Sequence, residues 1–331
     1  MTTEVSMRNW ETPEQMQFLG RVAAVLQEGR LLAPESLGLP SPLDMRGLTF
    51  PTVSRCKIAD LQTAVVDRIS GRLEFSNATL RDIDLTSARL SFSVWNNCAF
   101  ERVCFDKAAL HQVRFFGCRL VNCTFRSADI CDASFSIGRN GAETEITDTI
   151  FEKADFRGAS CKNPNFRATS FVNCKLDGFV FDGALCEDVG FTGTIKELTF
   201  RGVPNDGERN RLRINLSHAA IMWLNVDYGL DLHEVILPSD GSCLIVKSRL
   251  RAIECVCSRL PKDAGKYGSL VADVLKGLFS DRAISALEPS QDMILISKSM
   301  IADFAETDSM DIVNPLFNLV RAIAKSEGFL A

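Results

Sequence analysis

Large apolar residues recur at every fifth position between Leu73 and Phe135. The residue two places before each of them is mostly small, as at Ala78, Cys98 and Ala108. A period of five fits neither the 3.6-residue helix nor the two-residue alternation of a strand. The large positions are Phe75, Leu80, Leu85, Leu90, Trp95, Phe100, Phe105, Leu110, Phe115, Leu120, Phe125, Ile130 and Phe135.

A five-residue period has a simple physical explanation. Each block of five turns one corner, so four blocks make a square coil of roughly twenty residues, and coils stack at the β-strand spacing of about 4.8 Å. The large residue and the small residue of each block then point into the column. The other three positions face solvent, which explains why Arg, Asp, Asn, Ser and Thr collect there.

This pattern resembles the pentapeptide repeat family, and the resemblance covers about half of the chain. Members of that family form a right-handed quadrilateral β-helix, so the resemblance implies the same solenoid here. We therefore expect a mainly β protein with added helices: a β-helix, an N-terminal capping helix and a C-terminal α-helical domain. A repeat family implies a fold and does not by itself assign a function.

The repeat is predicted to span residues 43–201, with irregular first coils between Leu43 and Gly71. The pattern is lost at 136–148, where Gly138, Asn140 and Gly141 indicate an excursion from the column. It then resumes through 191. The large positions there that we expect to fill the column include Phe156, Phe166, Phe171 and Phe181.

Residues 1–42 are predicted to form a cap and a connector. Thr12 followed by Pro13 is typical of a helix start, and Gly29 is a suitable helix end. The stacked strands of a solenoid leave unpaired edges at both ends of the stack, so a helix that covers one end protects it.

After the repeat we expect an irregular closing segment, 202–246, which includes a possible last coil at 218–237 and a short strand at 242–246. From residue 247 to 331 the period becomes helical. Four helices are predicted: one stopped by Pro261, one around 270–278, one at 294–305, and one at 312–324 with Pro315 in its first turn. They would form a small domain that could also mediate a homodimer.

Composition argues against several functional classes. The formal charge is −5, and residues 72–201 hold 16 basic and 17 acidic residues, so direct nucleic-acid binding is not expected. No apolar run approaches the length of a membrane span, and the N-terminus does not resemble a signal peptide. We expect a cytoplasmic protein that does not contact a membrane.

The chain has twelve cysteines without zinc-finger spacing. Several occupy inward positions, and Cys98 and Cys118 should stack in adjacent coils. We expect a reduced packing ladder, as in a reducing compartment, while a disulfide or metal site remains the alternative. Cys255 and Cys257 should pack within a helix.

Catalytic constellations are missing from the sequence. Of the three histidines, His111 lies on an outward position, and no phosphate-binding or nucleophile motif occurs. His218 and His233 could bind a metal only if carboxylates such as Asp227, Asp231 or Glu234 converged on them. The chain is therefore predicted to be no enzyme and to need no cofactor.

The filled interior leaves the outer faces, the interruption and the C-terminal domain for function. The main hypothesis is a scaffold that binds an unidentified protein partner. The alternative is a DNA-mimicking protein that protects a topoisomerase such as gyrase, because some members of the family resemble DNA in width and acidity and carry a contact loop. The candidate partner-binding residues in the interruption are Arg139, Asn140, Glu143, Glu145 and Asp148.

Overall fold

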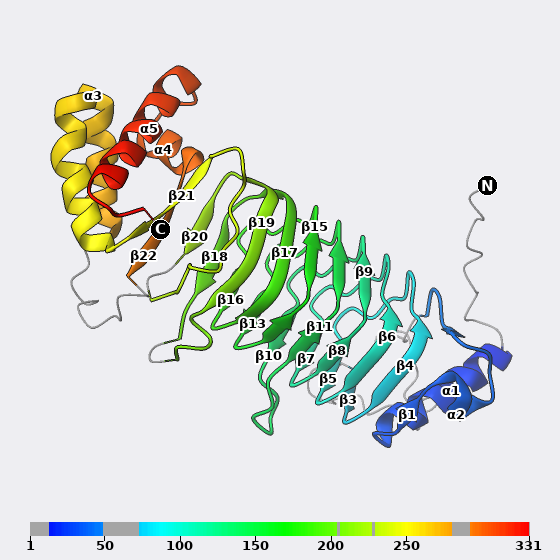
Figure 1. The fold of residues 1–331 in the computed structure, drawn as a ribbon. Helices are drawn as coiled ribbons and strands as arrows, with labels where there is room; N and C mark the ends of the chain where they lie inside the picture. Colours follow the sequence, from blue (N-terminus) through cyan, green and yellow to red (C-terminus); the bar gives the residue numbers. More distant parts are fainter. Residues whose placement is uncertain (1–12, 49–72, 204–205, 227–228, 280–291, 331) are drawn as a thin grey trace. The chain divides into compact units, whose positions relative to one another are not determined.

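The computed structural model describes residues 13–48, 73–203, 206–226, 229–279 and 292–330 (Figure 1). The chain divides into two compact units, Met1–Lys175 and Leu176–Ala331, each described here by itself. The irregular repeats predicted between residues 49 and 71 lie outside the described residues.

The first unit is a column of stacked parallel strands, which confirms the predicted β-helix (Figure 1). Leu80 pairs with Phe100 and Phe100 with Leu120, so one coil takes twenty residues. Each coil has four sides. Three of them contain strands, and the fourth is joined to its neighbours by isolated bridges, such as Arg89 to Ala109 and Ala109 to Asp129. One side consists of β3 (Glu74–Ser76), β5 (Val94–Asn96), β7 (Arg114–Phe116), β10 (Ser134–Ser136) and β13 (Ser160–Lys162). The next contains β4 (Thr79–Asp84), β6 (Ala99–Cys104), β8 (Arg119–Val121), β11 (Glu145–Thr147) and β14 (Asn165–Arg167), and a third contains β9 (Thr124–Arg126), β12 (Ile150–Glu152) and β15 (Ser170–Val172).

The interior of this column is built from the large residues of the five-residue blocks. Their rings stack from coil to coil: Phe105 and Phe125 lie 4.7 Å apart between ring centroids, and Phe125 and Phe151 are also 4.7 Å apart. Phe115 stacks on Phe135 at 5.4 Å. The large column residues predicted from the sequence are all buried, at Phe75, Leu80, Leu85, Leu90, Trp95, Phe100, Phe105, Leu110, Phe115, Leu120, Phe125, Phe156, Phe166 and Phe171 in this unit and Phe181 in the other.

Most corners of the column adopt a left-handed backbone conformation. Two residues after the large positions φ is positive, as at Asn77, Asp82 and Asn97, with Ile137 after Phe135 as an exception. Asparagine, aspartate and glycine tolerate this conformation better than other residues, which explains their frequency at the corners.

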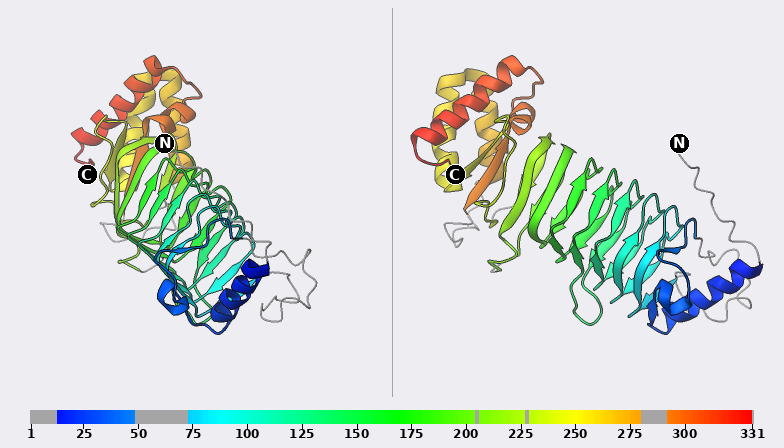
Figure 2. Two further views of the ribbon diagram at one scale, coloured as in Figure 1. Left: turned by 90° about the vertical axis from the view of Figure 1, so that its right-hand side faces the viewer. Right: turned by 45° about the vertical axis from the view of Figure 1, so that its right-hand side comes forward.

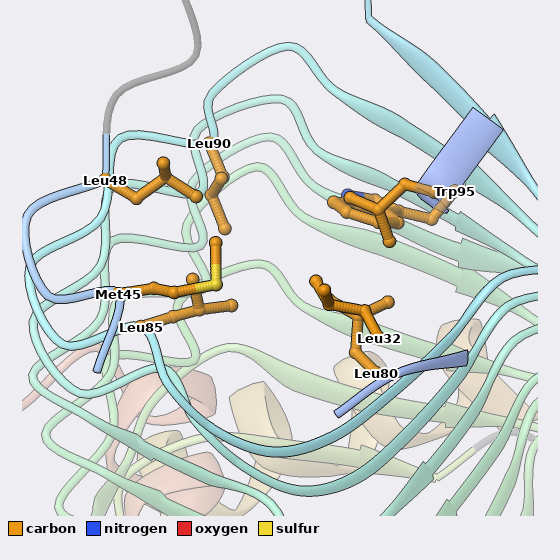
Figure 3. A pocket seen from close by; sticks show the side chains of 8 residues that line it. Leu32, Met45, Leu48, Leu80, Leu85, Leu90 and Trp95 are labelled. Carbon is orange, nitrogen blue, oxygen red and sulfur yellow. The ribbon is translucent and has the colours of Figure 1, made fainter. Parts of the chain in front are cut away.

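The N-terminal end of the column is covered by α1 (Pro13–Gln27), β1 (Leu31–Leu32), α2 (Pro34–Leu37) and β2 (Leu43–Asp44). Both short strands pair with β4, so the segment is part of the stack and protects its first edge. Between this segment and the first coils lies a small hollow, into which Leu32, Met45, Leu80 and Trp95 point (Figure 3). Its lining is apolar, so it is a packing imperfection with no group to orient a ligand.

The second unit begins with coils of its own. β16 (Val180–Asp182), β18 (Leu198–Arg201) and β20 (Leu224–Val226) stack in parallel on one side. On another side β17 (Leu185–Ile195) pairs with β19 (Leu212–Ile221) through a register interrupted by bulges. The segment predicted as an irregular closing stretch from residue 202 thus contains two further parallel strands, and Asn215 bridges to Ile236 beyond them.

The chain ends in a mixed α/β module instead of a purely helical domain. β21 (Cys243–Lys247) pairs with β22 (Met293–Ser297) in antiparallel fashion, and Val246 bridges to Leu330. The helices α3 (Arg249–Phe279), α4 (Lys298–Phe304) and α5 (Met310–Ser326) enclose one apolar core with these strands (Figure 2). None of the helices in the described ranges is long and apolar enough to cross a membrane.

Three helix predictions in this module were wrong. The helix expected at 294–305 begins only at Lys298, because all five residues of β22 are buried and no helical stripe exists there. Pro261 does not stop α3, which instead breaks at Gly265, where φ is 56° and ψ −134°. Pro315 lies inside α5, beyond its first turn.

The module packs on the last coil of its own unit. The Trp223 ring meets the Phe304 ring edge to face at 6.2 Å, and the Ser299 hydroxyl donates a hydrogen bond of 3.0 Å to the Ile221 carbonyl. A stack of strands needs such a cover at its end.

Candidate interaction site

The interruption of the repeat is a six-residue insertion. Ile146 pairs with Leu120, twenty-six residues earlier instead of twenty, so six residues leave the column between them. Removing Gly138–Glu143 from the sequence joins Ile137 to Thr144 and restores an unbroken five-residue period. We call these six residues the inserted loop; Figure 1 shows it projecting from the column after β10.

The predicted loop boundaries, 136–148, were therefore too wide. Glu145 belongs to β11, and Ile146 is a fully buried interior residue. Asp148 occupies an ordinary corner with φ of 49°. These residues belong to the column because Thr144 and Ile146 already fill its inward positions.

The inserted loop closes on itself through short hydrogen bonds. The Gly138 amide donates to the Ala142 carbonyl at 2.7 Å, and the Gly141 amide donates to the Gly138 carbonyl at 2.9 Å. The side-chain oxygen of Asn140 accepts a bond of 3.0 Å from the Ala142 amide. The loop is thus a defined turn, in keeping with its Asn and Gly content.

Two glycines seat the loop against the column. A Cβ atom at Gly117 would lie 2.6 Å from Asn97 Oδ1 and 3.0 Å from the Ala142 carbonyl oxygen. A Cβ atom at Gly138 would lie 2.5 Å from the same Asn97 oxygen. We call Asn97, Gly117 and Gly138 the latch. The loop and the corner approach each other closely beside Asn97, and only glycine at positions 117 and 138 leaves room for this approach.

The base of the loop is fixed by Thr144, which is fully buried. Its hydroxyl lies 2.6 Å from the Ser136 carbonyl oxygen and 3.1 Å from the Phe115 carbonyl oxygen. The two ends of the loop are therefore joined to each other and to the coil below.

Charged side chains of the loop are also tethered. Arg139 lies 3.1 Å from Glu74, whose carboxylate accepts a second bond of 2.6 Å from Asn96. Glu143 accepts a bond of 3.0 Å from Asn165. Arg139 nevertheless keeps 78% of its side chain exposed, so the loop presents one guanidinium in a restrained orientation.

Outside the loop, charges of opposite sign are stacked along the column. Arg102 binds both carboxylate oxygens of Asp82 at 2.6 and 2.7 Å. Arg126 lies between Asp106 and Glu152, at 3.3 and 3.2 Å. Each acid is thus partly neutralised by a base on a neighbouring coil, and these ladders present no continuous acidic stripe.

Asp155 is the most strongly perturbed carboxylate of these ladders. Hydrogen bonds from the Arg157 side chain, at 2.7 and 2.9 Å, hold its pKa well below the ordinary value, and Lys175 adds a bond of 3.1 Å. A depressed pKa in the folded state means that this carboxylate stabilises the fold above its ordinary pKa of 3.8. The stabilisation is lost as the pH falls through the folded-state pKa.

We therefore expect Asp155→Asn to lower the free energy of unfolding by about 1 kcal/mol at neutral pH, since a hydrogen-bonded charged group is replaced by a neutral one. The difference between the two proteins should shrink as the pH is lowered below 4. Urea unfolding across this pH range measures it. A difference that stays constant with pH would show that the charge of Asp155 contributes nothing.

The interior cysteines act as hydrogen-bond donors in the core. The thiol of Cys118 lies 3.1 Å from the Trp95 carbonyl oxygen, and that of Cys174 lies 3.2 Å from the Phe151 carbonyl oxygen. Burial raises the pKa of Cys123 and of Cys174 to about 12. Both are therefore protonated and unreactive at neutral pH. The described cysteines, Cys98 and Cys118 included, are free thiols.

Three of the candidate metal ligands, Asp231, His233 and Glu234, pair with each other or with arginines. His233 Nδ1 lies 2.7 Å from Asp231 Oδ1, and Glu234 pairs with Arg211 and Arg213 at 2.6 and 2.9 Å. Asp227 lies outside the described residues, and among those described there is no group of three potential metal ligands. Of Cys255 and Cys257, which were expected to pack within a helix, Cys257 is buried. Its thiol lies 3.3 Å from the Ala272 carbonyl oxygen.

The residues that lie against the loop cannot be recognised from the local sequence pattern. Asn97, Gly117 and Glu74 lie on other coils, twenty or more positions away from it. The available signal was the restored period after removal of Gly138–Glu143, which would have located the insertion. The column residues that contact the loop can be identified only when the register between coils is known.

Comparison with known proteins agrees with this architecture. Residues 83–120 match the model for pentapeptide repeats, with eight copies. No curated protein sequence matches the chain. No enzymatic family is indicated.

Solved structures with a similar fold include two pentapeptide repeat proteins. HetL, a regulator of heterocyst differentiation from the cyanobacterium Nostoc sp. strain PCC 7120, has 11% identity and a TM-score of 0.31, covering 60% of this chain and 90% of HetL. Full-length QnrB1, a plasmid-mediated fluoroquinolone resistance protein, has 15% identity and a TM-score of 0.26, covering 60% of this chain and 92% of QnrB1. Residues 83–120 therefore carry pentapeptide repeats, and the five-residue period and the parallel coils give the chain the β-helix fold of such repeats.

Proposed function

We propose that the chain is a non-catalytic scaffold that binds a protein partner, with the inserted loop as a principal contact. The observation that carries this proposal is the latch. Six residues leave an otherwise continuous column and then lie against it, in close contact at Asn97 and Gly117. The column does not need them, because their removal restores the repeat. A restrained surface loop costs little entropy on binding, which favours recognition.

The filled interior supports a role outside catalysis. Large rings occupy the column from coil to coil, and the apolar hollow near the cap offers no polar group to position a substrate (Figure 3). Contact with a partner is then left to the outer faces, the loop and the C-terminal module. We include in the proposal that this module adds a second contact, to the partner or to another copy of the chain.

The charge ladders argue against the alternative of DNA mimicry. A mimic of DNA needs a continuous row of negative charge, because duplex DNA carries one charge per ~1.7 Å of its axis. Here Arg102 faces Asp82, and Arg126 lies between Asp106 and Glu152. We therefore favour a partner that recognises shape and specific side chains over one that recognises a field of negative charge.

The test is affinity purification from native lysate with two proteins: the full chain and a variant lacking Gly138–Glu143. We expect a discrete partner to be retained by the full chain and to be lost, or weakened at least tenfold, with the variant. Because the deletion restores the repeat, its thermal unfolding should match that of the full chain. If the full chain and the deletion variant retain the same proteins equally, the loop is not a contact. If a topoisomerase subunit is among the retained proteins, the alternative of DNA mimicry is favoured.

A further inference from the structure

One corner of the column breaks the residue preference of the others. Phe92 has φ of 66°, in the left-handed region that bulky side chains rarely adopt. The other described non-glycine corners with positive φ hold polar or charged residues or, at one position, Ala168. An apolar aromatic residue at such a corner is unfavourable for the backbone.

Burial accounts for only part of this choice, because 42% of Phe92 remains exposed. Its amide donates to the His111 carbonyl at 2.9 Å, a backbone bond that another side chain would allow equally. An asparagine at this position would suit the corner better. A ring that strains the backbone and yet leaves a large part of its surface exposed is typical of functional positions.

The next coils support the ring from one side. His111 meets it edge to face, with 5.6 Å between ring centroids and 87° between planes. His111 Nδ1 in turn lies 3.8 Å from Asp132 Oδ2, and Arg114 donates a bond of 2.9 Å to the Asp132 carbonyl. The aromatic ring therefore packs on His111 while a large part of it faces solvent.

Two arginines belong to the same region of the column, along with Asp132. Arg89, three residues earlier on the same coil, is exposed and forms no ion pair within the described ranges. Arg114 lies on the next coil, where it is in register with Val94, the second residue after Phe92. A partly exposed aromatic residue with arginines on the same and the next coil has the composition of a binding hot spot.

We propose that Phe92 is the anchor of a second contact surface, formed with Arg89, His111 and Arg114, that binds an acidic segment of a protein partner carrying an aromatic or aliphatic residue. The apolar residue packs on the Phe92 ring, and its acidic neighbours pair with the arginines. This inference rests on the proposed scaffold function and adds the chemistry of the bound segment.

The test is selection of a displayed library of random linear peptides on the immobilised full chain. We expect enriched peptides in which aspartate or glutamate flanks an aromatic or aliphatic residue. They should bind Phe92→Asn at least tenfold more weakly, and should bind the variant lacking Gly138–Glu143 unchanged. Thermal unfolding of Phe92→Asn should occur at the same temperature or about 2 °C higher, since the backbone strain is relieved.

Peptides that bind Phe92→Asn as well as the parent, or a selection without enrichment, would overturn the inference. An Arg89→Ala variant provides an independent measure, because it lacks any change at the strained corner and should still weaken the acidic peptides. Failure here is distinguishable from failure of the scaffold proposal, which is refuted by the affinity purification with the loop deletion.

Discussion

Phe115→Asp is expected to unfold the column of the first unit. The Phe115 side chain is fully buried, stacks on Phe135 at 5.4 Å and meets Phe100 edge to face at 5.6 Å. A carboxylate at this position would be enclosed by aromatic rings without a partner, at a cost of several kcal/mol. That cost is comparable with the whole stability of a domain, about 5–15 kcal/mol.

Circular dichroism and thermal unfolding measure the effect. Ser127→Asp is the matched control, because Ser127 occupies an exposed corner with φ of 55° that aspartate tolerates well. The control should unfold within a few degrees of the parent, whereas Phe115→Asp should show no cooperative transition. An intact transition in Phe115→Asp would contradict the assignment of the five-residue period to the interior.

Gly117→Val should release the inserted loop while the coils stay folded. The added side chain would collide with Asn97 Oδ1 and the Ala142 carbonyl oxygen, and valine is strained at φ of 62°. Arg139, the second residue of the loop, then becomes a better trypsin site. We expect cleavage after Arg139 to accelerate about tenfold, equivalent to ~1.4 kcal/mol of local opening free energy.

Gly178→Val separates the collision from the backbone strain. Gly178 also has positive φ, at 74°, but a Cβ atom there would meet nothing within 4 Å. This control should lower stability without changing the rate of cleavage after Arg139. If both variants were cleaved at the same rate as the parent, the latch would not hold the loop.

The five-residue period was sufficient to predict the interior of the column. A large apolar residue such as Phe115, which recurs at every fifth position, can be buried in every coil only if that position points inward. The same period failed at the insertion. Ile146 is an interior residue that looked like part of a loop, since six extra residues displaced it from the frame. A repeat predicts local positions well and insertions poorly, because the register across coils depends on how many residues leave the column.

Other features depended on contacts that no local pattern contains. Met293–Ser297 is a short apolar run, equally compatible with a buried strand or a helix, and its pairing with Cys243–Lys247 decides in favour of the strand. The latch likewise joins Asn97 and Gly117 to a loop on a later coil. The strain at Phe92 could be seen only once the corner conformation was known.

The claim that a protein partner contacts the inserted loop is tested most directly by site-specific photo-crosslinking in intact cells. A photoreactive amino acid would replace Arg139, which is the most exposed charged side chain of the loop, or Ile150 on β12, an exposed residue outside the loop that serves as the control. The proposed function predicts one discrete crosslinked protein from position 139 and a much lower yield of it from position 150. Crosslinking of no protein from position 139, or of the same proteins in equal yield from both positions, would contradict it.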